Sequence, residues 1–128
     1  MKENSLYPPA WVKVAKKDWR RMRIMLDEKD AEAAGYFLQR SLEKYLKAFL
    51  LQKGWRLKKI HELDALLDEA VKYDSNLESF RGLCERVSGY YFTERYPELV
   101  EKGLTSEEVK NDIEEAERFI KLLISKRQ

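Results

Sequence analysis

The sequence predicts an all-α protein, an up-and-down four-helix bundle with one additional short helix, five helices in a single domain spanning residues 1–128. Three observations predict this fold. Apolar residues recur at spacings of three and four along most of the chain, as they do on one face of a helix. Prolines, glycines and capping sequences divide the chain into segments of helical length. No segment alternates apolar and polar residues with the β-branched enrichment of a strand.

The first helix is predicted to begin at Pro8-Pro9, because proline suits the first helical turn, and to end near Glu28-Lys29. Its apolar stripe consists of Val12, Ala15, Trp19, Met22 and Leu26. Asp30 is expected to cap the second helix, which continues to about Gln52 before Gly54 stops it.

The second helix carries more apolar residues than one buried face requires. They are Tyr36, Phe37, Leu38, Leu42, Tyr45, Leu46, Phe49, Leu50 and Leu51. The last helix shows the same excess. Exposed apolar surface of this kind calls for a partner, and the sequence therefore predicts a homodimer.

A loop over residues 53–60 leads to a third helix, predicted from about Glu62 to Tyr73. Ser75-Asn76-Leu77-Glu78 has the form of a capping box, and it predicts a fourth helix that ends near Tyr90.

Residues 91–103 contain a proline and a closing glycine without helical periodicity, and we expect them to form the longest loop. Thr105-Ser106-Glu107-Glu108 is a second capping box. It predicts a last helix that continues almost to the end of the chain, with helical spacing kept by Val109, Ile113, Ala116, Ile120 and Leu123.

Charge is distributed unevenly. The formal net charge is +2, but residues 1–64 carry +6 and residues 65–128 carry −4. The basic residues of the first helix are Lys13, Lys16, Lys17, Arg20, Arg21 and Arg23, with Asp18 among them. Such a helix suits phosphates or an acidic partner surface, and a solvated face paired with acidic neighbours is the alternative.

Several classes of function find no support in the sequence. The five glycines are isolated, so there is no glycine-rich phosphate loop, and no histidine or cysteine cluster has the spacing of a zinc site. We therefore expect neither a metal nor a cofactor. The one cysteine, Cys84, falls on an apolar helix face and is predicted to be a core residue. No apolar run is long enough to span a membrane and no targeting segment is recognisable, which predicts a cytoplasmic protein.

The order of several segments resembles the HEPN domains, small helical proteins of prokaryotes and of some large eukaryotic chaperone-like chains. These segments are a basic first helix with Asp18 and a tryptophan, Glu43-Lys44-x-x-Lys47, His61-Glu62-Leu63, and Thr93-Glu94-Arg95-Tyr96-Pro97. The resemblance implies a nucleotide- or RNA-binding module. It also implies a partner, because similar proteins are commonly encoded beside minimal nucleotidyltransferases, as toxin–antitoxin pairs or as split nucleotide-transferring enzymes.

Catalytic HEPN ribonucleases carry an arginine and, four to six residues later, a histidine on a late helix. In this chain Arg95 is followed by Tyr96-Pro97 and no histidine. The only match in spacing is Arg56 with His61, in the loop before the third helix. We therefore assign no catalytic residue.

The resemblance and the chemistry of the side chains give five candidate ligands for a nucleotide or RNA phosphate: Arg95, Tyr96, Lys44, Lys47 and His61. Each has a structural alternative. His61 suits a helix start, where its ring accepts from amides or packs under the loop, and Arg95 suits a loop anchor that pairs with a neighbouring glutamate. Lys44 and Lys47, together with Arg40, suit a solvated stripe.

Trp55 lies among basic residues and suits base stacking or, alternatively, closure of the bundle end. The function predicted overall is a non-catalytic phosphate-binding HEPN module that acts with a nucleotidyltransferase. The alternatives are a metal-independent ribonuclease and a purely structural helical assembly protein.

Overall fold

The computed structural model describes residues 5–95 and 103–125, the side chains of residues 91–95 excepted. Over these residues the chain forms helices and no strand, which confirms the all-α class. The elements are α1 (Pro8–Asp27), α2 (Ala31–Gln52), α3 (Leu63–Ala70), the 3-10 helix η1 (Ser75–Phe80), α4 (Arg81–Arg95) and α5 (Ser106–Ser125).

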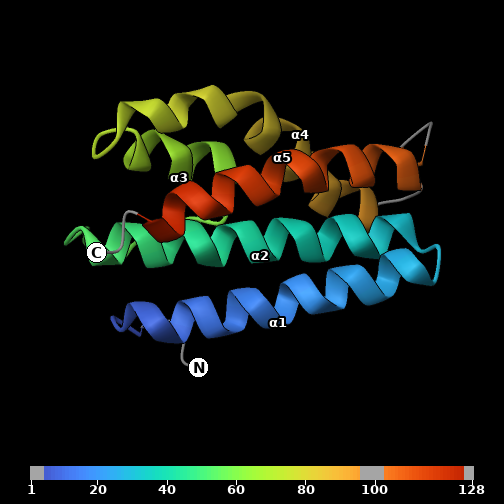
Figure 1. The fold of residues 1–128 in the computed structure, drawn as a ribbon, viewed down its shortest axis with the longest axis horizontal. Coiled ribbons are helices and arrows are strands. Elements are labelled where there is room, and N and C mark those ends of the chain that lie inside the picture. The colour runs from blue at the N-terminus through green and yellow to red at the C-terminus, as the bar shows by residue number, and fades with distance from the viewer. Residues whose placement is uncertain (1–4, 96–102, 126–128) are drawn as a thin grey trace.

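Helix α2 forms the middle of the molecule (Figure 1). Helix α1 runs back along one side of it, and α3, α4 and α5 pack on its other side. Leu38, Leu42, Leu46 and Leu50 of α2 have no exposed surface. A helix that is enclosed in this way must be apolar over most of its circumference.

The additional apolar residues of α2 therefore pack against other helices of the same chain. Of the nine α2 residues cited for the dimer prediction, six are buried, and Tyr36, Phe37 and Leu51 are partly buried. Their packing against α1, α3, α4 and α5 does not require a second copy. The homodimer stays a prediction without this support.

Most helix ends follow the capping residues predicted from the sequence. The Asp30 carboxylate accepts a hydrogen bond from the Ala33 amide at 3.1 Å, and α2 is followed by Gly54 at φ +88°, a conformation that favours glycine. At α5, the Glu108 amide donates to Thr105 Oγ1, and the Thr105 amide donates to the Glu108 carboxylate. This is the predicted reciprocal capping box.

Three boundaries differ from the prediction. Helix α3 is shorter than expected, ending at Ala70. Ser75 is not the cap of the fourth helix, because the Asp74 carboxylate accepts from the Asn76 amide and residues 75–80 form η1. Helix α4 continues to Arg95, so the first part of the predicted 91–103 loop is helical. Neither Gly82 nor Gly89 interrupts the helix over the residues that the structure describes.

Trp55 and Cys84 have the structural roles given for them above, closure of the bundle end and a place in the core. Trp55 is 7% exposed and donates its indole N–H to Glu69 at 3.0 Å, so it closes the end of the bundle. Cys84 is fully buried, and this burial raises the pKa of its thiol to about 12. Among the described residues, no helix is long and apolar enough to cross a bilayer.

Gly35 of α2 tests the close approach of α2 to Tyr90 of α4 and to Leu104, which precedes α5. A Cβ at this position would lie 2.5 Å from Leu104 Cδ2 and 3.2 Å from Tyr90 Cβ. Overpacking costs about 1–3 kcal/mol, and the helix propensity of alanine returns at most about 1 kcal/mol. We expect Gly35→Ala to lower the free energy of unfolding in urea by about 1 kcal/mol.

Gly89 of α4 is the matched control, because a Cβ there meets no atom of the described residues within 4 Å. Gly89→Ala is expected to raise the free energy of unfolding by about 0.5–1 kcal/mol. Equal stability of Gly35→Ala and the wild type would contradict the close approach.

Glu69 makes the stability of the fold depend on pH. Hydrogen bonds from Lys72, Trp55 and Lys58 lower the pKa of Glu69 to about 2. A folded-state pKa below the ordinary value of 4.5 stabilises the fold above that value, and the contribution is lost as pH falls from about 4.5 to about 2. We expect Glu69→Gln to be less stable than the wild type at pH 7, with the difference narrowing across this range in acid-unfolding curves. A constant difference would contradict this assignment.

Candidate functional site

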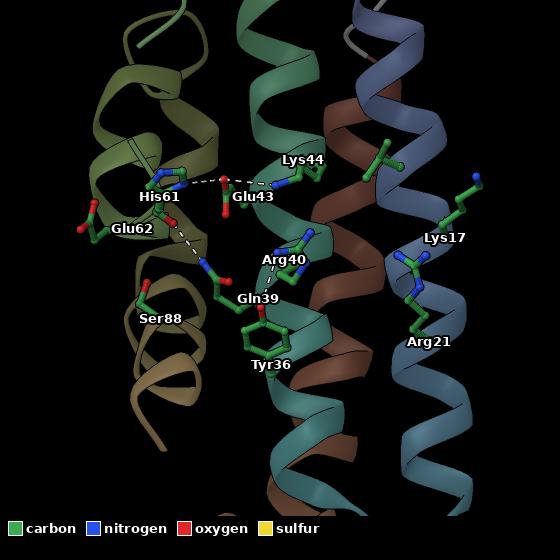
Figure 2. A pocket seen from close by; sticks show the side chains of 11 residues that line it. Lys17, Arg21, Tyr36, Gln39, Arg40, Glu43, Lys44, His61, Glu62 and Ser88 are labelled. Atoms are coloured by element: carbon green, nitrogen blue, oxygen red, sulfur yellow. Dashed lines mark hydrogen bonds and ion pairs between the residues drawn. The ribbon is translucent and has the colours of Figure 1, made fainter. Parts of the chain in front are cut away.

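A groove of about 720 Å³ crosses α2 between α1 and the segment that precedes α3. Figure 2 shows its side chains: Lys17 and Arg21 come from α1, Arg40 and Lys44 from α2, and His61 from the opposite wall. We call it the α1–α2 groove. It brings two arginines, two lysines and one imidazole together from three parts of the chain.

Asp18 lies beneath the arginines with no exposed surface. Its Oδ1 accepts from Arg21 Nη1 at 2.8 Å, and Arg40 Nε lies 3.5 Å from its Oδ2. Partial burial opposes the charge of Arg40, but the Asp18 carboxylate and Tyr36 outweigh it and raise the pKa of Arg40. Asp18 thus ties one guanidinium of α1 to one of α2, and both remain partly exposed.

Glu43 is a second buried carboxylate that pairs with cationic side chains, farther along α2. Its Oε2 lies 3.0 Å from Lys47 Nζ, 3.0 Å from His61 Nδ1 and 3.4 Å from Lys44 Nζ. Burial opposes ionisation of Glu43, but the charges of Lys44 and Lys47 and the hydrogen bonds from His61 and Lys47 lower its pKa. The buried group is therefore a carboxylate. The ammonium groups of Lys47 and Lys44 also lie over the Trp11 ring, 5.3 and 5.8 Å from its centroid.

The main chain around His61 is fixed by its neighbours. Gln39 of α2 donates its amide to the His61 carbonyl at 2.9 Å, and the Leu63 amide donates to Ser88 Oγ of α4 at 3.1 Å. The structural interpretation of His61 was wrong, because the ring contacts Glu43 and its side chain is 66% exposed. It neither caps a helix nor packs under the loop.

The predicted site residues divide into three groups. Lys44 and His61 line the groove together with Arg40. Lys47 does not line it: the side chain is 4% exposed, because its ammonium is drawn inward to the Glu43 carboxylate. The side chain of Arg95, and all of Tyr96, lie outside the described residues.

Sequence reasoning missed the residues that hold these cations. It treated Lys17 and Arg21 as part of a general basic helix and proposed no role for Asp18 or Glu43 as anchors. The spacings of Asp18 with Arg21 and of Glu43 with Lys47, three and four residues, are signals of such pairs. The pairing of Asp18 with Arg40 across two helices has no local signal.

The comparisons with known proteins agree with this fold. The profile of the HEPN domain matches residues 9–127, and the chain therefore belongs to the HEPN domain family. Family membership supports a nucleotide-binding or ribonuclease-like module.

The chain is also similar to a solved structure, described as the crystal structure of TT1696 from Thermus thermophilus. The TM-score is 0.77 at 20% identity, covering 93% of this chain and 97% of that one, and at this identity the likeness shows the fold alone. A search of curated proteins found no match.

Lys47 should act on stability, because it is a buried partner of a buried carboxylate. Removing one member of a buried ion pair costs about 3 kcal/mol or more, whereas an exposed pair contributes less than about 1 kcal/mol. We expect Lys47→Ala to lower the free energy of unfolding by about 3 kcal/mol in urea denaturation. The matched control is Lys58→Ala, which breaks the exposed Lys58–Glu69 pair and should cost less than about 1 kcal/mol. Equal effects would mean that Lys47 is not buried as described.

Proposed function

We propose that this HEPN protein binds the phosphate groups of a nucleotide or RNA and that the α1–α2 groove is the binding site. The observation that carries the proposal is the convergence of Lys17, Arg21, Arg40 and Lys44 on one hollow. Guanidinium groups pair with phosphate oxygens in forked geometry, and ammonium groups add point charges.

Two of the three carboxylates near the groove, Asp18 and Glu43, are buried, and the third, Glu62, is exposed on the His61 wall. Asp18 has no exposed surface and Glu43 is 4% exposed, so neither offers its charge directly to solvent. Both hold cationic side chains from below, whereas the guanidinium side chains of Arg21 and Arg40 are 48% and 37% exposed. A phosphate approaching the side of the groove formed by Arg21 and Arg40 therefore meets hydrogen-bond donors first.

We propose Arg95 and Tyr96 as further ligands from the resemblance alone. The same resemblance motivates the proposed partner, a minimal nucleotidyltransferase, in a toxin–antitoxin pair or as one part of a split nucleotide-transferring enzyme. Co-purification of the chain with the product of an adjacent nucleotidyltransferase gene would support this partnership. A chain that binds neither phosphate nor such a partner would favour the structural assembly protein.

We expect the cationic side chains of the α1–α2 groove to determine its affinity for RNA. We expect Arg40→Gln and Lys44→Gln each to weaken binding of a labelled oligouridylate by about 1 kcal/mol or more, and each should flatten the salt dependence by about one unit of slope. Fluorescence anisotropy at several salt concentrations measures both quantities. Competition by uridine triphosphate distinguishes a nucleotide site from an RNA site.

Arg118→Gln and Lys121→Gln are the matched controls, since these exposed residues of α5 do not line the groove. They make the same charge changes and should reduce affinity less. Equal losses in all four variants would indicate attraction by net charge rather than a site in the groove.

A metal-independent ribonuclease is the second candidate function. It is favoured by the pairing of His61 with Glu43 beside cationic groups, an arrangement that suits proton transfer. Against it, Arg56, which has the motif spacing to His61, is exposed and does not line the groove.

We therefore expect the purified protein to leave RNA intact in the presence of a chelator, as measured by gel electrophoresis of a labelled oligonucleotide. The His61→Ala variant serves as the control for contaminating nucleases. Cleavage by the wild type that disappears in His61→Ala would replace the binding function with the ribonuclease.

A further inference from the structure

Glu43 has a role beyond stabilising the interior. We propose that it is a positioning residue that fixes the proton of the neutral His61 ring on Nδ1 and so presents Nε2 to the ligand in the α1–α2 groove. This inference rests on the proposed function, since the ligand is the phosphate group of that proposal.

The first step concerns the direction of the hydrogen bond. His61 Nδ1 lies 3.0 Å from Glu43 Oε2. An ionised carboxylate only accepts hydrogen bonds, and Glu43 is kept ionised by Lys44 and Lys47. Nδ1 must therefore carry a proton and donate it, and in the neutral ring Nε2 is left as the unprotonated nitrogen.

The second step concerns the rigidity of this arrangement. Glu43 is held on α2 by its bond to the buried Lys47, and the His61 main chain is held by Gln39. The hydrogen bond between the Leu63 amide and Ser88 ties the following residues to α4. Both partners of the imidazole–carboxylate pair are thus fixed independently of each other, so the ring orientation is set before a ligand arrives.

The third step concerns what Nε2 can do. The His61 side chain is 66% exposed and lines the groove with Arg40 and Lys44. Once protonated, Nε2 donates to a phosphate oxygen, while the proton on Nδ1 stays there and is donated to the Glu43 carboxylate. A donor supported in this way by a carboxylate adds a directed contact to the diffuse attraction of the surrounding cations.

The test uses the fact that the chain has one histidine. Nitrogen-15 NMR of the free wild-type protein, at a pH where the ring is neutral, distinguishes the two tautomers directly. A neutral histidine in water carries its proton mainly on Nε2, so a dominant Nδ1–H tautomer is diagnostic of the Glu43 contact. We expect that tautomer in the wild type, a mixture in Glu43→Gln, and no change in Glu62→Gln, which removes the exposed carboxylate next to His61.

The second arm adds oligouridylate to the labelled protein. We expect the Nε2 resonance to move more than that of Nδ1, and Glu43→Gln to weaken affinity about tenfold, as for loss of a charged hydrogen bond. Because Glu43→Gln leaves Lys47 without its full partner, this variant is used only if its circular dichroism matches the wild type. The spectra of the wild-type protein identify the tautomer of His61 even without the Glu43→Gln variant.

Each outcome has a consequence. An Nε2–H tautomer in the free protein overturns the inference and leaves the proposed function intact. Oligouridylate that binds without moving Nε2 also overturns the inference alone. Failure of both oligouridylate and uridine triphosphate to bind overturns the proposed function, and with it the presentation of Nε2 to a phosphate ligand.

Discussion

The enclosure of α2 is the constraint on which the other features depend. Because helices pack against it from both sides, its polar side chains must find partners inside the protein. Ser41 donates to the Ala15 carbonyl, Gln39 to the His61 carbonyl, and Glu43 accepts from Lys47. The bonds of Ser41 and Gln39 orient α1 and the segment before α3 relative to α2. The helix that forms the core therefore also fixes the walls of the α1–α2 groove.

Buried carboxylates explain how cations gather in this groove. Like charges on neighbouring helices repel one another, and an anion between them reduces the cost of bringing them together. Asp18 supplies this charge between Arg21 and Arg40, and Glu43 supplies it among Lys44, Lys47 and His61. The same charges would cost several kcal/mol each if they were buried without partners. Removing either acid is therefore a change in both the stability of the bundle and the shape of the groove.

The sequence predicts those features that depend on local chemistry. The cap at Asp30, the stop at Gly54 and the box at Thr105 follow from hydrogen bonds within a few residues, and all three are present. The η1 helix was missed because the cap is Asp74, one residue before the predicted Ser75, and its carboxylate accepts from the Asn76 amide. Periodicity identified the apolar surplus of α2, but the choice between an enclosing bundle and a second chain depends on tertiary packing.

The candidate site could be predicted only in part, for a similar reason. Lys44 and His61 were found from a resemblance that fixes their order along the chain, and both line the groove. The inward turn of Lys47 follows from its bond to Glu43 and was not evident from a stripe of basic residues. The Asp18–Arg40 pair joins two helices, and no local pattern indicates it.

Mapping of phosphate contacts by NMR tests the central claim most directly. The backbone amide and arginine Nε–Hε resonances would be followed while pyrophosphate is added to the uniformly labelled protein. The α1–α2 groove predicts that the largest shifts occur at Lys17, Arg21, Arg40 and Lys44. Shifts centred instead on the hollow between α1 and α5, at Arg23 and Lys110, would contradict the claim that α2 organises the binding site.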